Sequence, residues 1–277
     1  MLIQKKNMVA CGLTLYLPEI EDIQNVLNLA EHFVRVYVYD NSDTPYDDSQ
    51  LKKKENVVII SQGYNDGLGV ACDSLCLAAK KDGVDYIVLF DQDSRMDSEA
   101  IQELLSDIGT DSQVALYCPQ VVLQGESAKH LVERENITWC ITAGTCVRLD
   151  LYGTIYQFDQ NYFIDRLDLD FCRQVTTQGY KIRRMNTAIM SQQLGNDLHQ
   201  FGNIKYSTHS GVRHYYLARN RLYFNHKFGI LGCSFPQTLK QILMIFLFEQ
   251  KKKEKICMTF RGICDYRKHK MGKCDYL

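Results

Sequence analysis

The 277-residue sequence predicts an α/β fold in which a mostly parallel sheet is flanked by helices and followed by a helical C-terminal extension. Strand-like and helix-like segments alternate through the first half of the chain, which is the order that a parallel sheet requires. The run at residues 86–90 is apolar throughout, as expected of a strand that is buried on both faces. Beyond residue 213 the patterns are helical. A chain of this length can hold one large domain or one domain with an appendage.

The elements of the first half follow from the spacing of apolar residues. In the first helix, for example, Ile20, Ile23 and Val26 form a single stripe. We expect strands at residues 8–16, 34–39, 57–60 and 86–90, and helices at 19–33, from the turn at 66–69 to residue 81, and at 98–108.

The pattern of the second half is less regular. We expect strands at residues 114–118, 139–149 and 181–190, a helix at 167–177, and C-terminal helices at 213–227, 236–250 and 253–269. Gly144 lies inside the second of these strands and indicates a bulge or a close approach of the backbone to a ligand. Gly179 fits the position that follows the end of a helix.

Charge is distributed unevenly along the chain. Residues 227–277 contain eleven Lys and Arg against four Asp and Glu, a local charge of +7, which leaves −8 for residues 1–226 given the net charge of −1. A basic end on an acidic body suggests an anionic partner such as a membrane surface. Residues 239–248 have a wide apolar face and precede Lys251, Lys252 and Lys253, which is typical of a helix that lies on a membrane. The alternative is that this face packs on the rest of the chain or on a second subunit of a homodimer.

The cysteine pattern favours a reducing compartment. The eleven cysteines include no Cys-x-x-Cys pair, and several lie inside apolar runs, where a thiol behaves as a small core residue. The apolar segment near the N-terminus lacks a small-residue cleavage site and is followed by Pro18 and Glu19, so we expect a strand there and not a signal peptide. The longest apolar run, at 242–248, is too short to cross a bilayer. We therefore expect a cytoplasmic protein, attached peripherally at the inner face of the plasma membrane if the basic helices bind lipid.

Polar residues occur where four of the predicted strands end. They are Thr14, Tyr16, Asp40, Asn41, Asp66, Gly67, Asp91, Gln92 and Asp93. Because open α/β sheets bind ligands beyond the carboxyl ends of their strands, this common position indicates a ligand crevice. Asp91 and Asp93 share a face in extended backbone, where their carboxylates can bind a divalent cation. The alternative is a solvated turn that caps the helix beginning near Glu99.

The chemistry of two residues of the crevice suggests specific roles for them. Asp40 can accept hydrogen bonds from a base or a ribose, or it can cap its own turn through an Asx interaction. Gly67 can let a backbone N–H group approach a phosphate. The full dinucleotide-binding glycine pattern is missing because Cys72 occupies the third glycine position, and no phosphate-binding Gly-Lys-Ser/Thr loop is present.

A second acidic cluster contains Asp165, Asp168 and Asp170. On a helix that begins near Leu167, Asp168 and Asp170 point about 200° apart, so they cannot both face one substrate. One carboxylate can serve as the general base for a hydroxyl nucleophile. Favourable placement in the first turn of the helix is the alternative.

Several of these segments together resemble family 2 glycosyltransferases of the GT-A (Rossmann-like) fold. The matching segments are Asp40-Asn41-Ser42, Asn65-Asp66-Gly67-Leu68-Gly69, Phe90-Asp91-Gln92-Asp93-Ser94, Ala143-Gly144-Thr145, Phe163-Ile164-Asp165-Arg166-Leu167-Asp168-Leu169-Asp170-Phe171 and Tyr215-Tyr216-Leu217-Ala218-Arg219-Asn220. The resemblance covers residues 8–270, and the order of the motifs is more specific than any one of them. The Asp-Gln-Asp-Ser and Phe-Ile-Asp-x-x-Asp patterns are most similar to the bacterial rhamnosyltransferase branch.

The resemblance implies an inverting, metal-dependent glycosyltransferase in cell-surface polysaccharide synthesis. The expected donor is dTDP-L-rhamnose and the expected acceptor is a hydroxyl group of a lipid-linked glycan. The implied catalytic domain is at 1–210, with a nucleotide-binding half at 1–95 and an acceptor half at 96–210, and the basic helical region follows at 211–277. No nucleic-acid partner is expected, because the sequence carries no motif for one.

Carried onto matching positions, the resemblance also implies roles for individual residues. Asp40 would bind the nucleobase of the donor. Asp91 would contact the ribose or diphosphate region, and Asp93, with Asp91 beside it, would bind Mg²⁺ or Mn²⁺. Asp168 matches the catalytic base of the family, and Asp165 is the second candidate.

At two further positions the chain has an alternative role or departs from the family pattern. Arg219 would help to hold the diphosphate, or else would form an ion pair on a helix surface. Relatives often carry His-x-Leu-Gly after the catalytic region, whereas this chain has Gln192-Gln193-Leu194-Gly195. Gln192 is a poor substitute for an imidazole, so we expect a weaker metal site, or one completed by water or by another residue such as His199.

Two other functions are compatible with the sequence. One is the same fold with a UDP-hexose donor that carries galactose, glucose or N-acetylglucosamine. The other is a catalytically silent binding subunit of a polysaccharide assembly complex, which the missing metal-binding histidine would allow. A sugar-phosphate nucleotidyltransferase is disfavoured, because residues 11–18 lack the basic, Gly-rich first loop that such an enzyme needs.

Overall fold

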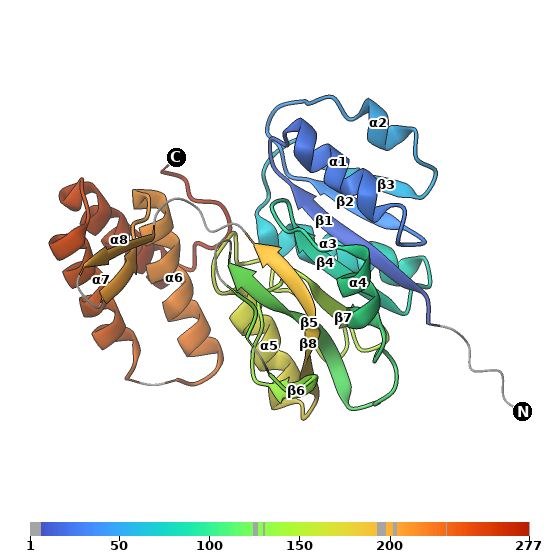
Figure 1. The fold of residues 1–277 in the computed structure, drawn as a ribbon. Coiled ribbons are helices and arrows are strands. Elements are labelled where there is room, and N and C mark those ends of the chain that lie inside the picture. The colour runs from blue at the N-terminus through green and yellow to red at the C-terminus, as the bar shows by residue number, and fades with distance from the viewer. Residues whose placement is uncertain are drawn as a thin grey trace, which may run out of the picture. The chain divides into compact units, whose positions relative to one another are not determined.

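The computed structural model describes residues 7–123, 127–129, 131–192, 198–201, 204–230 and 232–276. The chain divides into two compact units. The sheet unit comprises Met1–Asp159 and Asp168–Gln193, and the helical unit comprises Gln160–Leu167 and Leu194–Leu277. Figure 1 shows the elements of both units.

The sheet unit is built on eight strands in the order β3-β2-β1-β4-β7-β5-β8-β6. Their bounds are β1 (Val9–Leu15), β2 (Val36–Asp40), β3 (Val57–Ser61), β4 (Tyr86–Asp91), β5 (Val114–Leu123), β6 (Arg134–Ile137), β7 (Thr145–Arg148) and β8 (Lys181–Gln192). The strands β3, β2, β1 and β4 are parallel, as are β5 and β8, whereas β7 and β6 run antiparallel to their neighbours. The predicted α/β fold with a mostly parallel sheet is confirmed.

Helices cover both faces of this sheet. They are α1 (Ile20–Leu29), α2 (Ser49–Lys52), α3 (Leu68–Lys81), α4 (Ser98–Leu105) and α5 (Leu167–Thr177). On one face, Val26 of α1 and Ile101 of α4 join Leu13 of β1 in a single apolar core. On the other, Leu75 of α3 packs against β1 beside Gly12. Each such fully buried aliphatic side chain contributes roughly 1.5–3 kcal/mol to stability.

The structure differs from the predicted elements mainly in the second half of the sheet. The strand expected at 139–149 is confined to β7, because Gly144 adopts a left-handed φ of 73° that ends extended backbone. Conversely, β5 continues beyond residue 118, with a shift of register between Pro119 and Gln120 that accommodates the proline. The edge strand β6 was not predicted, because its residues are mostly polar and show no apolar alternation. It is held to β8 by pairing and by an ion pair of 2.6 Å between Arg184 and Glu135.

The helical unit contains α6 (Gly211–Lys227), α7 (Ser234–Phe248) and α8 (Lys252–Arg267), which contact one another, and the antiparallel pair β9 (Leu198–Phe201) and β10 (Ile204–Ser207). The three helices confirm the expected helical C-terminal region, whereas β9 and β10 were not expected. Helices α6 and α8 approach so closely that a Cβ atom at Gly262 would lie 2.4 Å from the carbonyl oxygen of Tyr215. Within the described part of the chain, no helix is sufficiently long and apolar to span a membrane.

A buried ionic network joins the three helices. Glu249 accepts hydrogen bonds from the Lys255 Nζ atom at 2.6 Å and pairs with His214 Nε2 at 3.0 Å. Burial by itself would raise the pKa of Glu249, but the bonds from Lys255 and His214 lower it. Burial also lowers the pKa of His214. The network fixes the junction between α7 and α8.

We predict that Gly144→Ala destabilises the sheet unit, because a Cβ atom there would lie 2.7 Å from Pro119 and 2.8 Å from the Met190 sulfur on backbone that already has positive φ. The expected loss in the free energy of unfolding is about 2–5 kcal/mol. Gly153→Ala is the matched control, since its φ is 79° but no atom lies within 4 Å of the added carbon. The control should lose only about 1–2 kcal/mol, from backbone strain. Equal losses in chemical denaturation would contradict the packing argument.

Candidate active site

The carboxyl ends of β1, β2, β3 and β4 meet at one edge of the sheet. Leu15 lies opposite Asp40 in the register of β1 and β2, and Thr14 lies opposite Asp91 in that of β1 and β4. Asp40 in turn lies opposite Ser61 of β3. The polar strand ends identified in the sequence are therefore neighbours in space.

The Asp91-Gln92-Asp93 turn carries the strongest electrostatic signal of this edge. Asp91 ends β4 and is partly buried, whereas Asp93 is exposed. Burial and, to a smaller extent, the negative charges of Asp93 and Asp168 together raise the pKa of Asp91 to about 6. Asp168 is far from this turn in the sequence but close enough in the structure for its charge to act on Asp91, so three carboxylates share this edge of the sheet unit. Titratable groups perturbed in this way are concentrated at functional sites.

The second acidic segment distributes its three carboxylates among different environments. Asp168 is partly exposed at the start of α5 and accepts a hydrogen bond from the Leu169 N–H group at 2.8 Å. Asp170 is buried and accepts a bond from Gln174 at 2.5 Å. Asp165 belongs to the helical unit, where it forms an ion pair of 3.1 Å with Arg213. Of the three, Asp168 is the carboxylate whose charge acts on Asp91.

Gln92 ties the turn to the rest of the sheet unit. Its side-chain oxygen accepts a hydrogen bond from the Tyr16 N–H group at 2.7 Å, and its side-chain nitrogen donates to Asp22 of α1 at 2.7 Å. Arg95 pairs with the same Asp22 at 3.2 Å and donates to the Gln92 carbonyl oxygen at 2.6 Å. Both ends of the Gln92 amide are thus bonded to protein, which favours a positioning role over contact with a nucleotide.

The loops after β2 and β3 are also cross-linked by polar side chains. Asn41 accepts a hydrogen bond from the Asp66 N–H group at 2.7 Å, and the Tyr39 hydroxyl donates to the Asp66 carboxylate at 2.6 Å. Gly67 has a φ of 87°, and its N–H group donates to Asn65. These interactions show Asn41, Asp66 and Gly67 shaping the loop that precedes α3.

Two aromatic rings are exposed beside these loops. Tyr16 follows β1 and is 46% exposed, and Tyr64 follows β3 and is 54% exposed. Asp40 accepts bonds from the Ser42 N–H group and the Ser61 hydroxyl, and its side chain stays partly exposed. Large exposed rings at the edge of a crevice can stack on a planar base. Tyr64 was not identified from the sequence, although its position between Gly63 and Asn65 in a strand-end loop was a usable signal.

Arg219 is fully buried in the helical unit. Its guanidinium carbon lies 5.2 Å from the ring centroid of Tyr215 and 5.0 Å from that of Tyr216, within cation–π distance. Its Nε atom donates to Asn220 at 3.1 Å. This environment favours a structural role for Arg219 over contact with a diphosphate.

Gln192 ends β8, and its neighbour Ser191 bridges to Arg95 just after the acidic turn. Gln192 lines a cavity of about 790 Å³ together with Trp139, Ile141 and Leu123. The chain therefore brings Gln192 to the edge that carries Asp93. The residues Gln193–Gly195 and the side chain of His199 lie outside the described residues.

The carboxylate cluster has the chemistry of a divalent-cation site without a preformed cage. Among the residues that the structure describes, His, Cys, Asp and Glu form no group of three arranged to hold a metal ion. Magnesium bound to a diphosphate typically takes only one or two carboxylates from the protein, which Asp93 and Asp91 can supply. Burial, followed by the charges of Asp93 and Asp168, raises the pKa of Asp91, and a bound cation would favour its ionised form. The donor set therefore fits Mg²⁺ or Mn²⁺.

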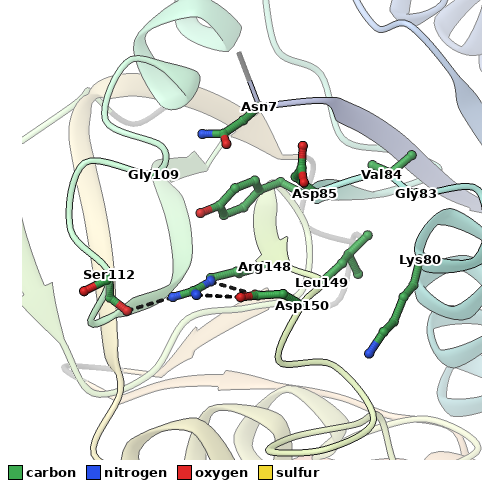
Figure 2. A pocket seen from close by; sticks show the side chains of 11 residues that line it. Asn7, Lys80, Gly83, Val84, Asp85, Gly109, Ser112, Arg148, Leu149 and Asp150 are labelled. Carbon is green, nitrogen blue, oxygen red and sulfur yellow. Dashed lines mark hydrogen bonds and ion pairs between the residues drawn. The ribbon is translucent and has the colours of Figure 1, made fainter. Parts of the chain in front are cut away.

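A separate cavity of about 430 Å³ lies at the opposite ends of the strands (Figure 2). Its charged groups are already paired, since Arg148 bonds both oxygens of Asp150 at 2.7 and 2.6 Å. Lys80 also lines this cavity and donates to the Tyr152 carbonyl oxygen at 2.5 Å. Its lining favours a structural role, so the carboxylate edge is the candidate active site.

Comparisons with known proteins identify the family of the chain. The family model described as glycosyl transferase family 2 matches residues 20–183. The chain is 25% identical over 225 residues to the dTDP-rhamnosyl transferase RfbF of Shigella flexneri, covering 74% of this chain and 75% of that protein.

Solved structures show the same fold. The S. aureus TarS structure (residues 1–349) in complex with UDP-GlcNAc matches with a TM-score of 0.59 and 13% identity, over 93% of this chain and 80% of that one. The GalNAc-T7 structure with UDP, GalNAc and Mn²⁺ matches with a TM-score of 0.58 and 9% identity. It covers 69% of this chain, which spans 45% of the GalNAc-T7 chain. These neighbours are GT-A glycosyltransferases, and the predicted GT-A fold is confirmed.

We predict that Asp91→Asn stabilises the metal-free protein. The folded-state pKa of Asp91 is raised to about 6, so the ionised carboxylate opposes folding at higher pH and the penalty disappears as pH falls toward the unfolded value. At pH 8 the variant should gain up to about 3 kcal/mol, or a few degrees in melting temperature, and at pH 4 almost nothing. Melting with EDTA across this pH range tests the prediction, with the exposed Glu99→Gln as control. A gain that does not change with pH would contradict it.

Proposed function

We propose that this chain, which belongs to glycosyl transferase family 2, transfers L-rhamnose from dTDP-L-rhamnose to a hydroxyl group of a glycan and inverts the anomeric configuration. That it is a glycosyltransferase follows from the family match, the relative and the structural neighbours. The observation that carries the proposed mechanism is the cluster of Asp91, Asp93 and Asp168 at the strand edge. The choice of donor is supported by the S. flexneri relative, whose name gives dTDP-rhamnose chemistry.

Asp168 is the proposed general base. It lies at the start of α5, is partly exposed, and is held by the Leu169 N–H group. Its carboxylate would accept the proton of the acceptor hydroxyl while that oxygen bonds to the anomeric carbon and the bond from that carbon to the diphosphate breaks. Attack on the face opposite the leaving group inverts the configuration. Asp165 is a weaker candidate, because its carboxylate already pairs with Arg213.

Asp93 is the proposed metal-binding residue, with Asp91 beside it. Mg²⁺ or Mn²⁺ bound there would offset the charge that develops on the leaving diphosphate. The Mn²⁺ in the structure of GalNAc-T7 supports such a requirement in this fold. Gln192 would contribute at most a neutral oxygen, so the two aspartates would supply the charge of the site.

The donor nucleotide would bind along the ends of β1, β2 and β3. The exposed rings of Tyr16 and Tyr64 offer stacking surfaces for the base. The Asp40 carboxylate would accept a hydrogen bond from the ring N–H group of a pyrimidine base, which both dTDP and UDP carry. Thr14, Asn41, Asp66 and Gly67 would shape the crevice, and Gln92 would keep the Tyr16 loop beside the acidic turn.

The acceptor would be a lipid-linked glycan used in cell-surface polysaccharide assembly. The cavity beside Gln192 is a candidate for part of its site, because Trp139 is 53% exposed at its border and an indole can pack on a sugar ring. Such an acceptor would place the reaction at the cytoplasmic face of a membrane.

We predict that Asp168→Asn lowers the turnover number by about 10²–10⁴-fold, because the amide cannot take a proton from the acceptor. Donor affinity, measured by nucleotide titration, should change little. Asp165→Asn is the matched control. It should retain turnover within tenfold of wild type, because Asp165 takes no part in the proposed proton transfer. The reverse result, with Asp165 essential and Asp168 dispensable, would move the base to the other unit.

We predict that dTDP with Mg²⁺ or Mn²⁺ raises the melting temperature and that EDTA abolishes the effect. At a ligand concentration of 100 times Kd, the stabilisation is about 2.7 kcal/mol. A panel of dTDP-L-rhamnose and UDP-hexoses, scored by transfer or hydrolysis, then identifies the sugar. Preference for a UDP-hexose would refute rhamnose as the transferred sugar. UDP-hexoses are included because the similar TarS structure contains UDP-GlcNAc. Failure of dTDP and UDP alike to stabilise the chain would refute donor binding and favour a silent subunit.

A further inference from the structure

Helix α7 turns its polar side toward the other helices of its unit. Gln241 donates to the His214 carbonyl oxygen at 3.0 Å and accepts a bond from Arg221 at 2.8 Å. Thr238 accepts a second bond from Arg221 at 3.0 Å. Ile245 on the same side is buried. The contacts that hold α7 in place are therefore largely hydrogen bonds.

The solvent side of α7 is apolar. Its side chains Phe235, Leu239, Leu243, Phe246 and Leu247 are between 52% and 77% exposed. Since an α-helix turns 100° per residue, these five side chains occupy an arc of about 120° opposite Gln241 and Ile245. A surface helix of a soluble protein normally has the reverse arrangement, with its apolar stripe on the core. A contiguous exposed apolar stripe of this kind marks an interaction surface.

The charges around this stripe are basic. Lys240 on α7 is exposed, as are the three residues Lys251–Lys253 that follow the helix, against one exposed carboxylate at Glu254. Glu249 and Lys255 are buried together and offset each other. The Lys252 Nζ atom lies 5.0 Å from the ring centroid of Phe246, so positive charge borders the apolar surface directly.

We infer that the α7 stripe, defined as Phe235, Leu239, Leu243, Phe246 and Leu247, docks on an anionic phospholipid surface. The apolar side chains would enter the boundary between headgroups and acyl chains, and the lysines would contact the anionic headgroups. A second copy of the chain is a poorer partner, because a two-fold contact through this stripe would bring like-charged lysines together. The inference rests on the proposed function only in that a membrane would hold a lipid-linked acceptor.

The test is sedimentation of the full-length chain with vesicles. Wild type should bind vesicles that contain phosphatidylglycerol, bind pure phosphatidylcholine weakly, and lose binding as salt is raised. Leu243→Ser with Phe246→Ser should weaken binding to the anionic vesicles by more than about tenfold. The triple variant Lys251→Gln, Lys252→Gln and Lys253→Gln should do the same on anionic vesicles only. The matched control, Val34→Ser with Leu77→Ser, removes exposed apolar side chains from the sheet unit and should leave binding unchanged.

Two results would overturn the inference. One is equal vesicle binding by wild type, by the Leu243→Ser/Phe246→Ser variant and by the variant with the three lysines replaced. The other is a dimer in light scattering that the Leu243→Ser/Phe246→Ser variant dissociates, which would make the stripe a contact between copies. Both variants should keep wild-type melting temperatures, since the altered side chains are exposed. Vesicle binding without any nucleotide stabilisation would instead leave the membrane surface intact and refute the proposed donor chemistry.

Discussion

The parallel register of β1 with β2 and β4 is the constraint on which the candidate site depends. It sets Leu15 opposite Asp40 and Thr14 opposite Asp91, so segments far apart in the sequence end at the same edge. Gly12 leaves room for the packing of this region, because a Cβ atom there would lie 2.9 Å from the end of the Ile87 side chain and force it to shift. The buried centre of the sheet thus determines where the polar chemistry is presented.

Bringing carboxylates together at this edge opposes folding, and the surrounding hydrogen bonds offset part of the effect. Burial and, after it, like charges raise the pKa of Asp91, which is a measure of that opposition. The bonds of Gln92 to Tyr16 and Asp22 hold the turn in place without adding another charge to it. A neutral amide suits this role, since a glutamate there would add to the repulsion. The site therefore combines carboxylates that oppose folding with a neutral amide that holds them in place.

Much of this site could be predicted from the sequence, because its chemistry is encoded in spacing. The apolar strand before Asp91 and the order of the motifs placed the acidic turn correctly at a strand end. Spacing could not show whether the side chains of Gln92 and Arg219 bond to a ligand or to the protein, because the same residue type can serve both roles. It also missed β6, whose polar residues are stabilised by pairing with β8. Such features depend on long-range contacts that leave no local periodicity.

The sequence also could not show which side of α7 faces solvent. Helical periodicity reveals that an apolar stripe exists but contains no information about which way it faces. The direction is set by Gln241, whose hydrogen bonds with Arg221 and His214 require its side of the helix to point inward. Those bonds are worth about 1–3 kcal/mol each where a charged group takes part, and an unpaired buried guanidinium would cost more. The polar network inside the helical unit therefore leaves the apolar side of α7 facing outward, and this exposes the α7 stripe for which we propose a phospholipid partner.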